Sequence, residues 1–199
     1  MATVIAVVGL KGGTSKSTTT IGLAEAAAAA GHAALVVDLD PQGSALGWAE
    51  EAAEAGTPLA STVIALPVKE LRRIGSLGCD VAVLDTPPAG PRIIDAAIAA
   101  ADQVVVPVAP TVLDVSRLWP VLDVADELGV PATVVLTRVR KGTRSVAEAI
   151  EAITEGGGRI AATQMPLREA WAQAHGGPLP AEMIAAHQAL LTELLKGTP

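Results

Sequence analysis

A glycine-rich segment near the N-terminus has the residue types and spacing of a phosphate-binding loop, Gly9-Leu10-Lys11-Gly12-Gly13-Thr14-Ser15-Lys16-Ser17-Thr18. In such a loop the glycines let backbone N–H groups turn toward an anion, and the following helix N-terminus adds partial positive charge. Lys16 would supply a mobile cation to the phosphates, and the Ser17 hydroxyl would bind Mg²⁺. The segment therefore predicts a site for ATP or ADP with Mg²⁺, in preference to a glycine turn with a purely structural role.

Two residues of this loop depart from the simplest pattern. Ser15 stands where a second glycine is expected, and a left-handed backbone there would cost a non-glycine residue roughly 1–2 kcal/mol. Such strain would weaken nucleotide binding or reshape the loop. Lys11 adds a second lysine, for which a solvated surface position and a second contact to the same phosphate are the simple interpretations.

Carboxylates follow two of the expected strands. Phosphoryl transfer to water needs charge neutralisation, a metal ion and a group that orients the attacking water. Asp85 comes directly after the expected strand 81–84 and would anchor Mg²⁺ through an ordered water. Asp40 follows the expected strand 34–37 by three residues. For both, an ordinary strand-end or helix-capping carboxylate is the alternative, and Asp38 could be structural support for the loop.

These residues must be positioned by a sheet, because short β-branched runs alternate with alanine-rich stretches throughout the chain. We expect an α/β fold, with a doubly wound, mostly parallel sheet covered by helices on both faces, in one domain over residues 1–199. The expected strands are 4–8, 34–37, 81–84, 104–108, 133–136 and 160–164. The expected helices are 17–30, 44–55, 68–74, 92–101, 114–128, 145–154, 167–174 and 181–195, with Pro120 kinking or dividing the fifth.

Residues 11–18 resemble the deviant Walker A motif of the ParA/MinD ATPases, a P-loop NTPase family, with Ser15 in place of a glycine. Further segments follow in the family's order. Residues 37–42, Val-Asp-Leu-Asp-Pro-Gln, resemble switch I, and residues 85–88, Asp-Thr-Pro-Pro, resemble Walker B and switch II. The resemblance extends from residue 2 to about residue 175 and is greatest to the small plasmid-partition ParA proteins.

The resemblance implies roles for individual residues. Lys11 would reach across a dimer interface to the nucleotide of the other subunit, which implies a homodimer bridged by ATP. Asp40 would position the hydrolytic water, so that Lys11, Lys16 and Asp40 form the catalytic set. The expected nucleotide contacts are Lys11, Gly12, Gly13, Thr14, Ser15, Lys16, Ser17 and Thr18, together with two segments that flank adenine in the family, Thr137-Arg138 and Pro166-Leu167. A plain loop is the alternative for each of those two segments.

Charge is unevenly distributed along the chain. The formal net charge of −7 argues against a surface that attracts polyanions everywhere, but residues 137–199 carry 7 bases against 6 acids. The densest basic cluster contains Arg140, Lys141 and Arg144, with Arg138 beside it. These cations could hold DNA non-specifically, because phosphate contacts need only well-placed positive charge. A solvated loop between a strand and a helix is the equally weighted alternative.

Composition excludes several other classes of protein. The single cysteine, Cys79, excludes an internal disulfide framework and favours a reducing, cytoplasmic setting. No apolar run approaches the roughly 20 residues that span a bilayer, so no membrane partner is expected. The amphipathic segment 183–195 has only Lys196 as a cation near its end, which favours packing against the core over a membrane-surface helix.

The resemblance therefore implies a partition ATPase that dimerises with ATP, binds DNA non-specifically at the nucleoid and segregates plasmid or chromosomal DNA. A ParB-like centromere-binding partner would stimulate its slow hydrolysis. Because the chain begins at its first strand, we expect no N-terminal helix-turn-helix extension and no operator binding. The alternatives are a related ATPase that positions a protein cargo, a P-loop metabolic ligase or kinase, and a nucleotide-binding module impaired by Ser15.

Overall fold

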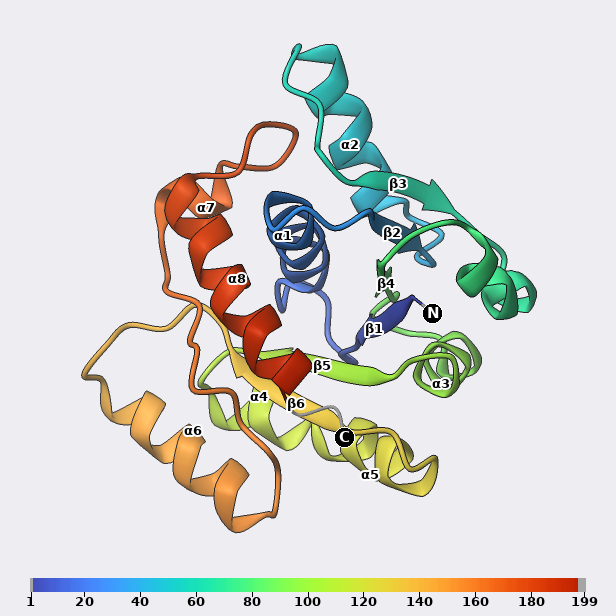
Figure 1. Ribbon diagram of the computed structural model, residues 1–199. Helices are drawn as coiled ribbons and strands as arrows, with labels where there is room; N and C mark the ends of the chain where they lie inside the picture. The colour runs from blue at the N-terminus through green and yellow to red at the C-terminus, as the bar shows by residue number, and fades with distance from the viewer. Residues whose placement is uncertain (1, 197–199) are drawn as a thin grey trace.

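The structure is a computed structural model that describes residues 2–196, and its centre is a six-stranded sheet (Figure 1). All neighbouring strands are parallel, in the order β3-β2-β4-β1-β5-β6. The strands are β1 (Thr3–Val7), β2 (Ala34–Asp38), β3 (Thr62–Ala65), β4 (Val81–Asp85), β5 (Gln103–Val108) and β6 (Ala132–Leu136). The expected α/β fold is confirmed, since continuous hydrophobic strands are buried on both faces by helices.

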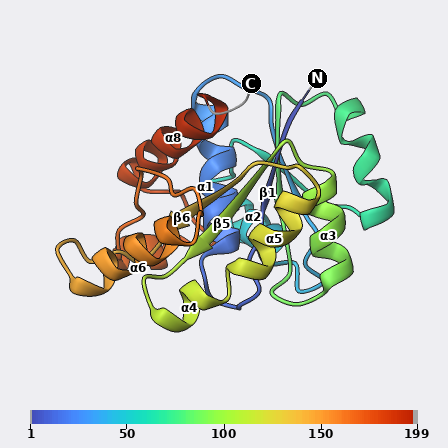
Figure 2. The same ribbon diagram turned by 90° about the horizontal axis from the view of Figure 1, so that it is seen from below.

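Helices cover the two faces of the sheet in two groups. Alternate residues of β1 show the division: Ile5 and Val7 belong to one buried cluster, whereas Val4 and Ala6 belong to the other. The first face carries α1 (Lys16–Ala29), α2 (Ser44–Glu54), α7 (Glu169–Ala172) and α8 (Ala181–Lys196). The second face carries the 3₁₀ helix η1 (Val68–Ser76), α3 (Pro91–Ala99), α4 (Val112–Ser116), α5 (Trp119–Glu127) and α6 (Arg144–Glu155), as Figure 2 shows from below.

The expected helix over residues 114–128 is divided into α4 and α5, as Pro120 predicts. Pro120 is the second residue of α5, where the missing N–H leaves no helical hydrogen bond unmade. The segment 68–76 is helical as expected, although it forms η1 rather than an α-helix.

The expected strand over residues 160–164 is wrong. Backbone hydrogen bonds join Ala161 to Val134 and Met165 to Leu136, and only one isolated parallel bridge, at Ile160, forms beside β6. The ladder breaks between them because Glu193 of α8 accepts hydrogen bonds from the N–H groups of residues 162 and 163, at 2.8 and 2.9 Å. A side chain from a distant helix thus takes donors that a strand would have used.

The strand β3 was not expected from the sequence. It has four residues at the edge of the sheet, and its terminal residues Thr62 and Ala65 are exposed. An edge strand this short gives no continuous buried run, so the pattern that marks the other strands is missing.

The C-terminal helix α8 packs along α1, where Figure 1 shows the two side by side. Its buried face includes Met183, His187, Leu190 and Leu194. This confirms packing against the core for the segment 183–195. Among residues 2–196, no helix combines the length and apolarity needed to cross a bilayer.

Candidate functional site

The phosphate loop joins β1 to α1 at the edge of the sheet where the parallel strands end. Lys16 is the first residue of α1 and is buried, and its Nζ donates a hydrogen bond to the backbone carbonyl of Lys11 at 3.1 Å. Burial lowers the pKa of Lys16, and the nearby Asp85 and Asp40 carboxylates oppose that shift. The loop therefore places an ammonium group and a helix N-terminus together, which is the arrangement that phosphate binding requires.

The backbone of Ser15 is left-handed, with φ 71° and ψ 27°. Gly13, two residues earlier, has φ 74°. The position occupied by Ser15 is therefore one that favours glycine, and the strain expected from the sequence is present. The loop keeps the required shape despite the serine.

A candidate Mg²⁺ site lies where α1 faces the end of β4. Thr20 Oγ1 donates a hydrogen bond to Asp85 Oδ1 at 3.2 Å, and the Ser17 hydroxyl is near enough to favour the charged form of this carboxylate. Burial is the main cause that raises the pKa of Asp85 to about 7. Among the described residues, Asp85 Oδ2 is a buried oxygen without a hydrogen-bond partner. A hydroxyl and an unsatisfied carboxylate oxygen fit Mg²⁺, which prefers oxygen ligands and retains water.

Asp38 and Asp40 have different roles in the loop after β2. The buried carboxylate of Asp38 accepts hydrogen bonds from the N–H groups of Asp40, Ala45 and Leu46, at 2.9–3.0 Å. Asp38 therefore fixes the loop to the first turn of α2, which supports the structural interpretation. Asp40 is half-buried and lines the cavity beside the phosphate loop, so its carboxylate can reach a bound ligand.

Two neighbouring cavities that share lining residues mark the ends of the candidate nucleotide site. The phosphate-end cavity, about 430 Å³, is lined by Gly12, Gly13, Ser15, Lys16, Ser17, Thr18 and Asp40 among others. The base-end cavity, about 260 Å³, contains all four residues expected beside adenine, Thr137, Arg138, Pro166 and Leu167. Contact of these four residues with adenine stays a prediction.

Four aromatic residues of the base-end cavity were not identified as site residues from the sequence, namely Trp48, Trp171, His175 and His187. Trp48 lies within the stretch from residue 2 to about residue 175 that resembles the ParA proteins, six residues after the switch I segment. The other three come from α8, α7 and the turn between them, and no motif or spacing marks them. His187 is 1% exposed, and burial lowers its pKa to about 4, so it is neutral near pH 7.

Lys11 does not line either cavity. Its Nζ forms an ion pair with Asp114 of α4 at 2.6 Å, and its side chain is 39% exposed. Burial favours the neutral form of Asp114, but hydrogen bonds from Lys11 and Thr111 prevail and lower its pKa. Three large apolar residues are exposed around this pair: Leu10, Val112 and Leu113. The Lys11–Asp114 ion pair therefore brings exposed apolar residues of the phosphate loop and of α4 near each other.

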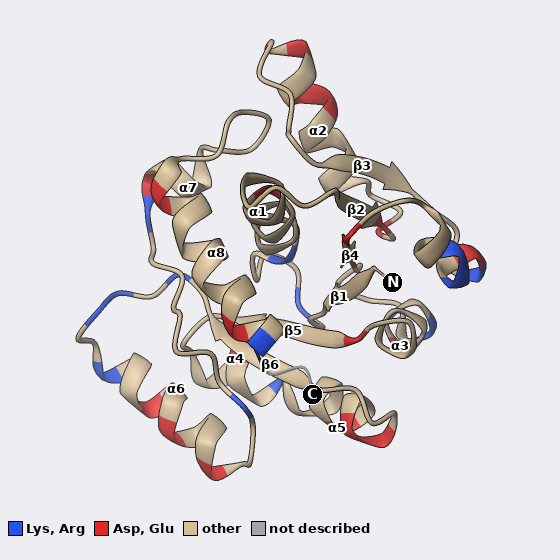
Figure 3. Ribbon diagram, in the orientation of Figure 1, with Lys and Arg blue, Asp and Glu red and all other residues tan. Residues whose placement is uncertain are grey.

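The basic cluster is exposed, with Arg140 and Lys141 in the loop before α6 and Arg144 as the first residue of α6 (Figure 3). Arg144 forms an ion pair with Glu148 one turn along α6, at 2.6 Å. Within residues 2–196, neither Arg140 nor Lys141 has a carboxylate at ion-pair distance, so two of the three cations are uncompensated. A second basic group, Lys69, Arg72 and Arg73 of η1, was not identified as a surface of interest from the sequence. In Figure 3 it lies at the right edge of the molecule, across from the cluster before α6.

Comparison with solved structures identifies the fold. A plasmid partition protein from Borrelia burgdorferi bound to AMPPNP has a TM-score of 0.80 at 19% identity, with 98% of this chain and 99% of that chain covered. The septum site-determining protein MinD of Pyrococcus horikoshii with Mg-ADP has a TM-score of 0.77 at 16% identity, covering 99% and 98%. At these identities the likeness concerns the fold alone.

Sequence comparison identifies the family. The chain is 43% identical over 152 residues to the maintenance of carboxysome distribution protein A of Gloeobacter kilaueensis, covering 75% of this chain and 68% of the relative. The CobQ/CobB/MinD/ParA nucleotide binding domain matches residues 5–179. The resemblance to the ParA/MinD proteins is thus confirmed: the chain belongs to the CobQ/CobB/MinD/ParA family of nucleotide-binding domains.

Proposed function

We propose that the protein is an ATPase of the ParA/MinD type that uses ATP-dependent dimerisation on DNA to position a protein assembly. The observation that carries the choice of cargo is the 43% identity to a carboxysome distribution protein, since this relative positions a protein structure. This is the alternative that the sequence left open, and it replaces DNA segregation as the main proposal.

The residues of the cleft suit ATP and Mg²⁺. The backbone of residues 12–18 and Lys16 would hold the phosphates, and Ser17 with Asp85 would hold the metal, directly or through water. Bound Mg²⁺ supplies charge neutralisation at the phosphates. Asp40, fixed through its N–H to Asp38, would orient the attacking water. Hydrolysis then needs no covalent step on the protein, and positioning and electrostatics account for it.

Support for a homodimer comes from the surroundings of Lys11. Exposed Leu10, Val112 and Leu113 would be buried by a second copy, which gives association an apolar contribution. Lys11 would exchange Asp114 for a phosphate of the facing subunit. Two triphosphates that face each other repel unless cations lie between them, so the lysine makes nucleotide part of the contact.

Lys11→Ala tests this proposal. Light scattering of the wild type with Mg²⁺ and AMPPNP is expected to give twice the mass found with ADP, and the variant is expected to remain monomeric with both nucleotides. The control is Lys69→Ala, which removes an equal charge at an exposed position of η1. This variant is expected to dimerise with AMPPNP as the wild type does. A Lys11→Ala protein that dimerises with AMPPNP would reject the assignment of Lys11.

The second candidate function is DNA segregation with a ParB-like partner at the nucleoid. The fold of plasmid partition proteins and the exposed cations before α6 favour it. Deletion of the gene in its native host separates the two candidates. Scattered or clustered protein assemblies with normal DNA inheritance support the first candidate, whereas loss of a plasmid or chromosome supports the second.

A further inference from the structure

His175 lies where the two cavities of the cleft meet. Its side chain is 51% exposed and lines both the base-end and the phosphate-end cavity. Most residues of the phosphate-end cavity, including Lys16 and Asp40, do not extend to the base end, and Pro166 and Leu167 do not extend to the phosphate end. In the proposed nucleotide site, His175 would therefore face the part of the nucleotide between its base and its terminal phosphates.

The imidazole of His175 is held in place by α2. Its ring packs on Trp48, with ring centroids 4.9 Å apart and planes tilted by 53°. Trp48 is 1% exposed, and its Nε1 donates to the carbonyl of Gly177 at 3.4 Å. One turn along α2, Glu51 Oε2 lies 3.8 Å from His175 Nε2 and packs against Gly176, where a Cβ would lie 2.3 Å from the same oxygen. Two side chains of α2, Trp48 and Glu51, thus border the half-exposed ring of His175.

The ring nitrogens of His175 are available to a ligand. Among the described residues, neither nitrogen makes a hydrogen bond, and the carboxylate of Glu51 is beyond hydrogen-bond distance. A histidine that only filled a gap between α2 and α7 would be buried by that packing, as His187 is. An oriented, half-exposed donor that borders both cavities is what a ligand contact requires.

We propose that His175 is a nucleotide-binding residue that hydrogen-bonds ATP and ADP at the ribose or the α-phosphate. Both nucleotides share these groups, so the contact does not distinguish ATP from ADP; it adds affinity for the nucleotide in either state. Trp48 and Glu51 are its supports. This inference rests on the proposed function, in which the cleft binds ATP and ADP, and it adds a residue that contacts them.

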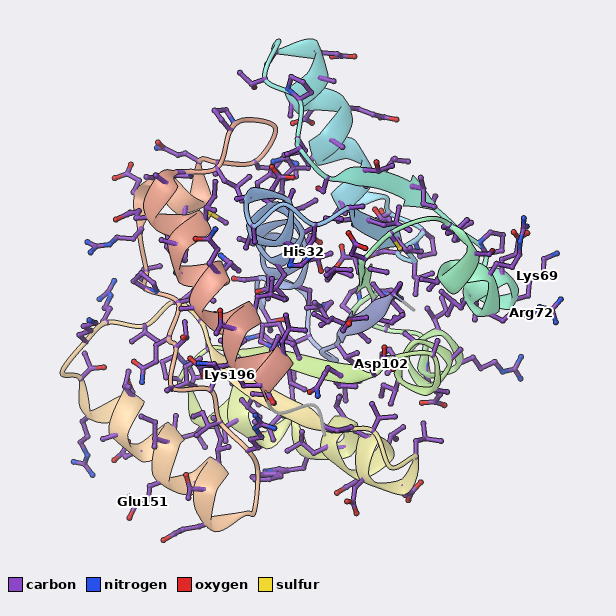
Figure 4. All side chains as sticks on the ribbon, viewed as in Figure 1. His32, Lys69, Arg72, Asp102, Glu151 and Lys196 are labelled. Atoms are coloured by element: carbon purple, nitrogen blue, oxygen red, sulfur yellow. The ribbon has the colours of Figure 1, made fainter. Side chains whose placement is uncertain are left out.

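Calorimetric titration of ADP and of AMPPNP, each with Mg²⁺, tests the proposal. His175→Ala is expected to raise the Kd of both nucleotides about tenfold, and His175→Gln, which keeps a donor, is expected to recover most of that loss. The control is His32→Ala, an exposed histidine beyond the opposite end of α1 that is labelled in Figure 4 and is expected to leave both Kd values unchanged. Equal Kd values for His175→Ala and wild type would overturn the inference.

A spectroscopic measurement keeps the test independent of any variant's stability. The chain has three histidines, so the imidazole Hε1 resonances can be assigned from single substitutions. Saturating ADP is expected to shift the His175 resonance and to leave that of His32 in place. An unmoved His175 resonance in a protein that binds ADP overturns this inference alone, whereas a wild type that binds neither nucleotide overturns the proposed function with it.

Discussion

At the scale of single residues, Ser15 carries strain that a glycine would remove. Its φ of 71° is disfavoured for a side-chain-bearing residue, while glycine adopts it freely but loses more entropy on folding. Ser15→Gly is therefore expected to raise the unfolding free energy by about 1 kcal/mol, equivalent to about 2–4 °C in Tm. Thermal unfolding without nucleotide measures it. The control, Ser145→Gly at an exposed position of α6, should instead lower the unfolding free energy by about 0.5 kcal/mol; the same direction in both variants would contradict the argument.

The residues that sequence analysis identified are those whose chemistry is encoded locally. The phosphate loop, Asp40 and Asp85 each adjoin a strand end, and the topology then brings the strand ends together. Trp171 and His175 could not be found in this way. His175 reaches the cleft because the turn after α7 contacts Trp48 of α2, more than 120 positions earlier in the chain. Trp171 is held by Glu182 and His187 of α8. Such contacts leave no periodicity in the sequence.

At the scale of elements, the packing of α8 on α1 depends on Gly22. A Cβ on Gly22 would lie 2.5 Å from the imidazole of His187, which is buried and cannot move aside. Gly22→Ala is expected to lower the unfolding free energy by about 1–3 kcal/mol, although alanine favours a helix by about 1 kcal/mol. Denaturant unfolding measures the loss.

Gly47 supplies the matched control for that change, because it is also a helical glycine, but a Cβ added to it would meet no neighbouring side chain within 4 Å. Gly47→Ala should raise the unfolding free energy by up to about 1 kcal/mol.

Packing between elements also explains why residues 160–164 do not form the expected strand. The N–H groups of residues 162 and 163 donate to Glu193 of α8, and no sequence pattern links these residues to Glu193.

At the scale of the whole molecule, the net charge of −7 means that the proposed DNA binding would depend on a local surface rather than on the overall field of the protein. The exposed and unpaired Arg140 and Lys141 provide such a surface, whereas Arg144 is already paired with Glu148. Because the proposed dimer would present the pair twice, contacts that are weak in a monomer would gain avidity. DNA retention should therefore depend on AMPPNP and fall as salt rises.

The double change Arg140→Ala/Lys141→Ala tests this surface against a control of equal charge. It is expected to weaken AMPPNP-dependent DNA binding and to flatten the slope of log K against log salt by about 0.9 for each DNA phosphate that the protein no longer neutralises. In the control, Lys69→Ala/Arg72→Ala, the side chains removed point into solvent from η1 (Figure 4), and the net charge also changes from −7 to −9. If both proteins lose affinity equally, net charge governs binding; if only the control loses it, the DNA surface is η1. If the Arg140→Ala/Lys141→Ala variant keeps the wild-type slope, the loop before α6 is not part of the DNA-binding surface.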